Sequence, residues 1–158
     1  MPEYLKLNNS GYEKALAKEY EDAFKDFDSS IRKYDRYWLA YSNRGGCYFI
    51  QGKYEKAMED FNTSISLHKK NEFAFDGRAL CKEELNDYIG AISDFRQAIK
   101  YNKRFYIAYT HLGVLLSDID SCKQALYYLK IGLEKKAFND CTSEQEVIHL
   151  INKCQQKK

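Results

Sequence analysis

The sequence has no excess of charge of either sign. It contains 25 basic and 23 acidic side chains, spread along the whole chain, and its formal net charge is +2. A protein that binds nucleic acid is expected to gather a basic field, so this balance argues against that class. No apolar run approaches the length of a membrane span, and Met1–Glu3 does not resemble a signal peptide. These absences predict a soluble, cytoplasmic protein with neither nucleic acid nor membrane among its partners.

Motifs that carry enzymatic chemistry are missing as well. The chain has no glycine-rich phosphate loop, no GxSxG and no HExxH sequence. The histidines His68, His111 and His149 lie far apart. His149 and Cys154 are five residues apart, so they do not share a helix face well enough to chelate a metal. We therefore expect no catalytic residue, no metal site and no cofactor.

What the sequence does contain is a repeat with a period of 34 residues. The same spacing of tyrosine, alanine, aspartate and phenylalanine occurs three times, and a fourth copy is looser. The copies are Tyr20/Ala23/Asp26/Phe27, Tyr54/Ala57/Asp60/Phe61, Tyr88/Ala91/Asp94/Phe95 and, loosely, Cys122/Ala125/Leu129. No residue is inserted or deleted between copies, which indicates a repeat array.

The period and its residues resemble the tetratricopeptide repeat (TPR), a helix–turn–helix unit of this length. In the family's first helix a bulky residue precedes a small one, here Leu7/Gly11, Tyr41/Gly45, Phe75/Ala79 and Tyr109/Gly113. In its second helix a small residue precedes a large one, here Ala23/Phe27, Ala57/Phe61, Ala91/Phe95 and Ala125/Leu129. The resemblance implies an all-α fold, a right-handed α-solenoid of four repeats plus a C-terminal capping helix.

The resemblance also implies boundaries. We expect a single TPR domain over residues 1–158, with repeats at about 4–37, 38–71, 72–105 and 106–139. The turn within each repeat should fall at Lys18, Gly52, Asn86 and Asp120, because glycine, asparagine and aspartate tolerate a left-handed backbone. The stretch Asn8–Gly11 reads more like a turn than a helix interior, which predicts a short or frayed first helix.

After Asn139 the repeat pattern stops and a different helix signal follows. Ser143 and Glu146 form a capping box at the start of an apolar stripe made by Val147, Ile148, Leu150, Ile151 and Cys154. This pattern predicts a cap helix at about 143–155 that covers the fourth repeat, as terminal caps of repeat arrays do. The same helix could instead dock onto a partner.

The five cysteines are expected to be small core residues. Cys47 and Cys81 occupy equivalent positions in neighbouring repeats, about 10 Å apart, which is too far for a disulfide. The remaining three are Cys122, Cys141 and Cys154, and no CxxC pair occurs. An odd count of cysteines fits a reducing compartment.

Two arginines stand where the family has leucine. Arg44 and Arg78 each precede an aspartate by sixteen residues, Asp60 and Asp94, and the fourth repeat has neither charge. This joint occurrence predicts a partly buried Arg–Asp pair between the two helices of one repeat. Asp26 has no arginine in its own repeat and could reach Arg44 of the next.

The resemblance implies that a partner binds in the concave groove lined by the first helices. The positions carried across form an apolar strip with acids along one side. The candidate groove residues are Tyr12, Leu39, Asn43, Phe49, Phe73, Asp76, Leu80, Glu83, Ile107, Thr110, His111, Val114 and Asp118. Alternatively, several aromatic side chains turn inward or another copy of the chain fills the groove.

These features predict a non-catalytic scaffold that binds a protein or peptide segment. The segment should be apolar and neutral or basic. The alternative is a self-assembling or complex-assembly subunit that uses its terminal repeats, and so a possible homo-oligomer.

One well-known TPR ligand is not expected. Family members that grip an acidic C-terminal carboxylate use lysine, asparagine and arginine at positions that here hold Asn8, Tyr12, Asn43, Phe73 and Gly77. Only Asn43 matches, and starting the pattern one repeat later matches nothing. Asp76 and Glu83 would moreover repel an acidic tail.

Overall fold

The structure, a computed structural model, describes residues 1–138 and 142–156. In these residues the chain forms nine α-helices and no β-strand. The helices are α1 (Glu3–Leu16), α2 (Tyr20–Lys33), α3 (Trp38–Ile50), α4 (Tyr54–Leu67), α5 (Glu72–Glu84), α6 (Tyr88–Tyr101), α7 (Tyr106–Asp118), α8 (Cys122–Glu134) and α9 (Glu144–Gln156). Within this described part, no helix has both the length and the apolar character needed to cross a membrane.

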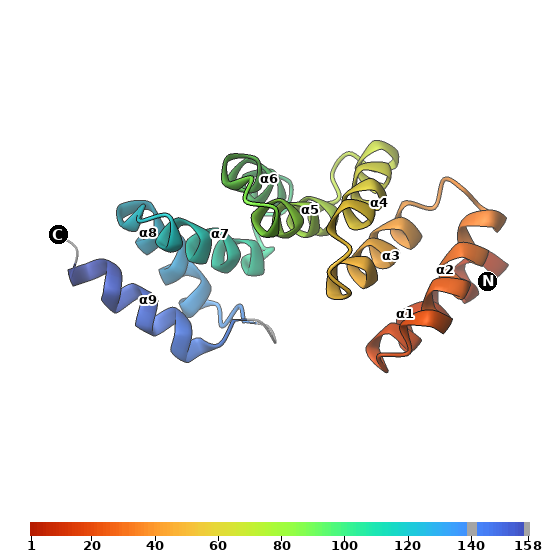
Figure 1. The fold of residues 1–158 in the computed structure, drawn as a ribbon, viewed down its shortest axis with the longest axis horizontal. Coiled ribbons are helices and arrows are strands. Elements are labelled where there is room, and N and C mark those ends of the chain that lie inside the picture. Colours follow the sequence, from red (N-terminus) through yellow and green to blue (C-terminus); the bar gives the residue numbers. More distant parts are fainter. Residues whose placement is uncertain (139–141, 157–158) are drawn as a thin grey trace.

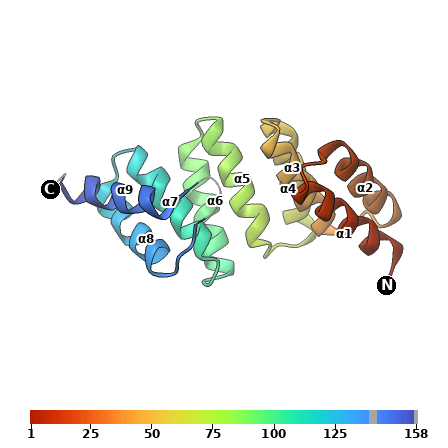
Figure 2. The same ribbon diagram turned by 90° about the horizontal axis from the view of Figure 1, so that it is seen from below.

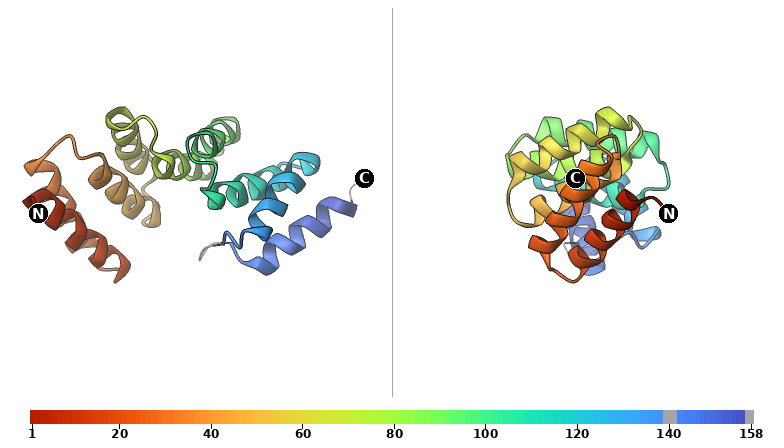
Figure 3. Two further views of the ribbon diagram at one scale, coloured as in Figure 1. Left: turned by 180° about the vertical axis from the view of Figure 1, so that it is seen from behind. Right: turned by 90° about the vertical axis from the view of Figure 1, so that its right-hand side faces the viewer.

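The helices pack as successive pairs that form an arch (Figure 1). In that view α3 and α5 lie on the inner side of the arch, while α4 and α6 lie on the outer side. Figure 2 looks at the array from below, toward the inner side, and Figure 3 shows the two termini at opposite ends. The fold is therefore the all-α solenoid that the sequence predicts.

The turn inside each pair has the left-handed backbone that the repeat pattern predicts, including at Lys18, whose residue type does not favour it. Lys18, Gly52, Asn86 and Asp120 have φ values of 64°, 70°, 61° and 59°. This left-handed conformation ends a helix by letting the next N–H groups bond back to its last carbonyls. Because the turn recurs at the same place in all four pairs, each pair closes in the same way.

Small residues let the two helices of a pair approach closely. Ala23, Ala57, Ala91 and Ala125 are fully buried, beside large side chains at Phe27, Phe61, Phe95 and Leu129. A Cβ atom built on Gly11 would lie 2.8 Å from the Phe27 ring, and one on Gly113 would lie 2.8 Å from Leu129. Glycine is required at these positions because the neighbouring side chain already fills the space.

The first helix is complete, so the prediction that it is short or frayed was wrong. Its polar residues have tertiary partners: the Ser10 hydroxyl donates to Asp26 (2.7 Å), and Asn8 accepts from Asn43 of the next pair (3.0 Å). Asn8 is only 2% exposed. These contacts between helices outweigh the weak intrinsic helix propensity of the stretch.

The four described cysteines are buried in the core, as predicted, but two of them form a disulfide that the sequence did not indicate. Cys122 and Cys154 form a disulfide between α8 and α9, whereas Cys47 and Cys81 are free and buried. Cys141 lies outside the described residues. The distance argument from the repeat period applied only to equivalent positions, and α9 lies outside the period. Burial raises the pKa of the Cys47 thiol to about 11, which leaves it unreactive.

Helix α9 covers the end of the array, as the apolar stripe predicts. Its first turn is capped by Ser143, whose hydroxyl accepts from the Glu146 N–H (3.2 Å). Val147 and Cys154 are buried, and α9 packs against α8 and α7. Ile148 is the exception in the stripe because it is 41% exposed.

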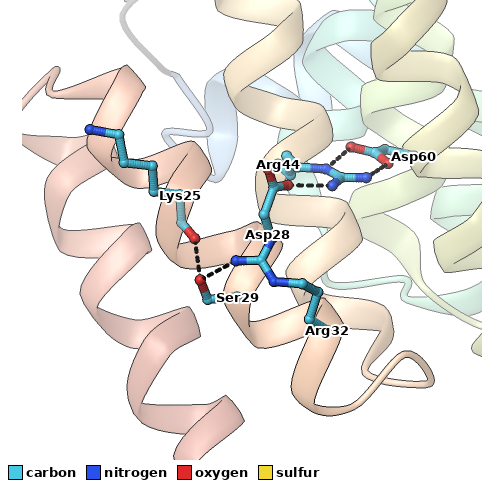
Figure 4. Close-up of polar contacts among 6 residues, drawn as sticks. All are labelled: Lys25, Asp28, Ser29, Arg32, Arg44 and Asp60. Atoms are coloured by element: carbon cyan, nitrogen blue, oxygen red, sulfur yellow. Dashed lines mark hydrogen bonds and ion pairs between the residues drawn. The ribbon is translucent and has the colours of Figure 1, made fainter.

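An arginine joins the two helices of the second pair and also the pair before it (Figure 4). Arg44 donates to both carboxylate oxygens of Asp60, at 2.8 and 2.6 Å, and to Asp28 at 2.6 Å. The hydrogen bonds that Arg44 donates to Asp60 raise the pKa of its guanidinium, so the group stays charged although it is partly buried. The expected pair is confirmed, but the partner from the preceding repeat is Asp28, because Asp26 is bound by Ser10 and Lys14.

The third pair repeats this arrangement with one change. Arg78 donates to both oxygens of Asp94, each at 2.7 Å, and to the Asn62 side chain at 2.6 Å. Asn62 thus takes the place that Asp28 has one repeat earlier. Asp94 has a second cation, since Lys82 lies 2.8 Å from it.

Candidate functional site

Helices α1, α3 and α5 line one long groove on the inner side of the array. The groove has a volume of about 610 Å³. Its most exposed walls are apolar: Tyr12 is 50% exposed, Leu16 68%, Ile50 63% and Phe73 58%. Large exposed apolar patches are uncommon on monomeric proteins and usually mark sites of interaction with a partner.

Polar side chains that line the groove already have hydrogen-bond partners within the protein. The Asn43 amide donates to Asn8 (3.0 Å), and the Asn71 amide donates to the Ser42 hydroxyl (2.7 Å). The hydroxyls of Ser42 and Ser64 are also hydrogen-bonded (2.7 Å). Because these bonds lie within the protein, this part of the groove presents mainly apolar surface to a ligand.

A smaller cavity of about 180 Å³ continues the groove toward the C-terminal end. It shares Phe49 and Leu80 with the long groove and adds Glu83, Glu84, His111, Val114 and Thr142. The surface therefore changes from apolar to acidic along its length.

A buried ion pair lies at this junction. Nδ1 of His111 on α7 is 3.0 and 3.2 Å from the two carboxylate oxygens of Asp76 on α5, and both residues are 7% exposed. Burial lowers the pKa of His111, but the charge and hydrogen bond of Asp76 together with the charge of Glu83 outweigh this effect, so the pKa is raised above its ordinary value. The pair joins the third and fourth helix pairs across the groove.

Glu83 is the unusual acid of the smaller cavity. Burial raises its pKa from 4.5 to about 7. His111 opposes this rise, while Asp118, Glu84 and Asp76 add to it. Near neutral pH, Glu83 is therefore partly protonated in the unbound protein, and a nearby cation would favour its ionised form.

This environment predicts a pH-dependent stability. A carboxyl with a raised folded-state pKa stabilises the fold below its unfolded pKa, and this contribution is lost as pH rises from about 4.5 to about 7. The raised pKa of His111 has the same sign, with full stabilisation below 6.5 that is lost at higher pH. We expect Glu83→Gln to melt like the parent at pH 5 and above it at pH 8.

The test is a series of thermal melts of both proteins across this pH range. Comparing the two proteins cancels the titration of every group that they share. A difference in melting temperature that does not grow with pH would contradict the assigned environment of Glu83.

Most of the candidate groove residues line these two cavities. Those in the long groove are Tyr12, Leu39, Asn43, Phe49, Phe73, Asp76 and Leu80, and those in the smaller cavity are Phe49, Leu80, Glu83, His111 and Val114. Leu16 also lines the groove but is absent from the sequence candidates. Its spacing of four residues from Tyr12 on one helix face could have revealed it.

Three candidates do not line the groove. Thr110 is fully buried, and its hydroxyl donates to the Ala137 carbonyl at 2.7 Å. Thr110 borders neither cavity, although Asn8, Ser42 and Asp76 at the equivalent repeat positions line the long groove, so its assignment to the groove was wrong. Ile107 borders neither cavity, and Asp118 lines a separate pocket that Glu83 and Glu84 also line.

The described residues offer no metal centre, because no three His, Cys, Asp or Glu side chains among them gather as ligands would.

Comparison with known proteins gives one sequence match. Residues 38–71 match the sequence model of the tetratricopeptide repeat. No curated protein sequence matches the chain.

Solved structures similar to this chain share its fold at low sequence identity. The first TPR domain of Spaghetti (RPAP3), bound to the HSP90 peptide SRMEEVD, has a TM-score of 0.70 and 18% identity, over 75% of this chain and 94% of that one. The Arabidopsis OM64 TPR domain has a TM-score of 0.62 and 23% identity, over 64% and 84%. A TPR protein from Parabacteroides merdae has a TM-score of 0.74 and 19% identity, over 98% and 61%.

The family match and the geometry agree. The matched segment 38–71 contains α3 and α4. The other three helix pairs have the same period and the same left-handed turn. The chain therefore has the fold of tetratricopeptide repeat proteins, and its second helix pair matches the sequence model of that repeat.

Proposed function

We propose that this protein is a non-catalytic scaffold that binds a peptide segment of a partner in its inner groove. The observation that carries the proposal is the apolar strip on α1, α3 and α5. Tyr12, Leu16, Ile50 and Phe73 are each at least half exposed there. A partner segment that covers these side chains would remove apolar surface from water, which favours binding.

The charge of the groove favours a neutral or basic segment. Glu83 and Glu84 border the smaller cavity, and Asp118 lines a separate pocket that they also line. A lysine or arginine of the partner would meet opposite charge there, whereas an acidic side chain would be repelled. Binding of a basic segment should weaken as salt rises and should release protons near neutral pH, since the cation favours ionised Glu83.

The acidic peptide bound by the similar RPAP3 domain serves as a negative probe. At positions where carboxylate-binding TPR proteins use lysine, asparagine or arginine, this chain has Tyr12, Phe73 and Gly77, which carry no positive charge. We predict that SRMEEVD does not bind this chain at micromolar concentration, as measured by isothermal titration calorimetry. Micromolar binding that is lost when the peptide's C-terminal carboxylate is amidated would refute this prediction.

The main experiment compares two labelled peptide pools of equal length. One pool mixes leucine and phenylalanine with lysine, and the other mixes the same apolar residues with glutamate. Fluorescence anisotropy should detect binding of the lysine pool alone. If both pools bind equally, the acidic end does not select the partner; if neither binds, the groove is not a peptide site.

A matched pair of variants locates the binding surface. Ile50 is 63% exposed in the groove and Ile89 is 85% exposed on α6 outside it, so lysine should be tolerated by the fold at both positions. Ile50→Lys should weaken binding of the lysine pool at least about tenfold, a change of about 1.4 kcal/mol. Ile89→Lys makes the same charge change and should leave binding within about twofold. Equal effects of the two variants would contradict binding in the groove.

Leu80 is less suitable for this experiment. It lines both cavities, but it also packs against the largest core cluster. A carboxylate at this position would be partly buried, so Leu80→Glu would lower stability together with binding.

The second candidate function is self-assembly. The open apolar strip would suit another copy of the chain as well as a partner. Sedimentation over a range of concentrations separates the two, because a monomer at every concentration removes self-assembly.

A further inference from the structure

One glycine in the groove has no structural reason to be glycine. In the first helices, a Cβ atom on Gly11, Gly45, Gly77 or Gly113 would press against a large side chain of a neighbouring helix. Close packing therefore accounts for these four. Gly46 differs, because no heavy atom lies within 4 Å of the position its Cβ would take.

The backbone does not require glycine at this position either. Gly52 is the only glycine with positive φ among the described residues, and Gly46 lies inside helix α3. A glycine in a helix interior destabilises the helix relative to alanine. A side chain at position 46 would therefore be expected to make the unbound protein more stable.

The missing side chain leaves a gap in a row. The positions equivalent to Gly46 in the other repeats hold Tyr12, Leu80 and Val114, which are all apolar. Gly46 lines the long groove together with Tyr12 and Leu80, and Phe49 and Phe73 line it too. The absence of one side chain from this row makes a notch with apolar walls at the middle of the groove.

We propose that the notch at Gly46 holds one bulky apolar side chain, leucine or an aromatic ring, of the bound partner segment. This inference rests on the proposed function of the groove and deepens it. The nearby amides and hydroxyls are paired internally, as in the Asn43–Asn8 and Asn71–Ser42 bonds. A polar side chain in the notch would lose water without gaining a partner, whereas an apolar one gains burial. Large apolar side chains in central, water-excluding pockets carry much of the affinity of interfaces.

The location of the notch also indicates the order of residues in the partner. Phe49 and Leu80 are shared by the groove and the acidic cavity, so the two sites are adjacent. A segment with its anchor at Gly46 would place a neighbouring residue near Glu83. The expected partner therefore carries a large apolar residue close in sequence to a lysine or arginine.

The test uses a graded series at one position. The probes are two lysine-containing peptides that differ at one residue, phenylalanine or serine. Gly46→Ala leaves most of the notch open and should change the affinity for the phenylalanine peptide by less than about threefold, while Gly46→Leu fills the notch and should weaken it at least about tenfold. Affinity for the serine peptide should be weak and unaffected by either variant. Both unbound variants should melt at or above the parent, because the added atoms meet open space and improve helix propensity.

Each other outcome overturns a different statement. If Gly46→Leu binds like the parent while Ile50→Lys does not bind, the groove remains a binding site and the anchor notch is refuted. If Ile50→Lys also has no effect, the proposed function itself fails. A Gly46→Leu protein that melts below the parent would show that the space is not open. If the parent self-associates and Gly46→Leu prevents it, the occupant is a second copy of this chain and not a separate partner.

Discussion

Replacing Arg44 by methionine should destabilise the protein by about 3–5 kcal/mol, because a buried carboxylate is left without its cation. Asp60 is 5% exposed and accepts two hydrogen bonds from Arg44. Burial raises the pKa of Asp60 even in the presence of Arg44, which opposes this rise. Removing the guanidinium should therefore make the ionised carboxylate costly and should also release Asp28, which ties the first repeat to the second. Urea unfolding followed by circular dichroism measures the loss.

Arg78→Met is the matched control. Asp94 is equally buried, but Lys82 stays 2.8 Å from it. We therefore expect a smaller loss, about 1–2 kcal/mol. Replacing Asp60 by leucine together with Arg44→Met should recover most of the stability, because no buried charge remains. Equal losses in the two single variants would show that Lys82 does not compensate.

Opening the Cys122–Cys154 disulfide should lower the stability of the C-terminal end by about 3–4 kcal/mol. The bond closes a loop with a sequence separation of 32, and a crosslink of this span reduces the entropy of the unfolded chain by that amount. Helix α9 would then be held by its apolar contacts alone, including Val147 and Leu150. Because each repeat contacts only its neighbours, α9 and α8 should unfold before the rest of the array.

Thermal melts with and without a dithiol reductant test this prediction. Cys154→Ser should melt like the reduced parent and should not respond to reductant. Hydrogen exchange should localise the lost protection to α8 and α9. A parent protein that melts identically in both conditions would rule out a stabilising disulfide. Because disulfides persist mainly in oxidising compartments, a thiol count on the native protein would also test the cytoplasmic location, which stays a prediction.

The fold follows from local signals that recur at a fixed period. Gly52, Asn86 and Asp120 are residues that tolerate the left-handed backbone, and each ends a first helix where the repeat predicts. Alternating small and large residues, such as Ala57 and Phe61, identify the faces that pack together. Both signals depend on nearest neighbours along the chain, so a single sequence contains them.

The sequence determines less of the groove, because the groove depends on contacts between repeats. Thr110 and Val114 are four residues apart on α7, on one side of the helix, yet Thr110 is buried and Val114 lines a cavity. Which of the two faces the groove depends on the angle at which α7 packs against its neighbours, and the period does not contain that angle. The raised pKa of Glu83 likewise arises from walls that different helices supply.

Tertiary packing also decided the partners of polar and sulfur-containing side chains. Asp26 and Asp28 are two residues apart on one helix, and only the packing of α2 against α3 selects Asp28 for Arg44. The stretch Asn8–Gly11 is helical because Asn43 and Asp26 satisfy its polar groups from other helices. Cys154 bonds to Cys122 because α9 packs on α8. Since α9 lies outside the repeats, the 34-residue period does not predict this pairing. Helices and turns follow from interactions between near neighbours, which the sequence records directly, whereas these pairings depend on the orientation of whole helices and appear only when the array is assembled.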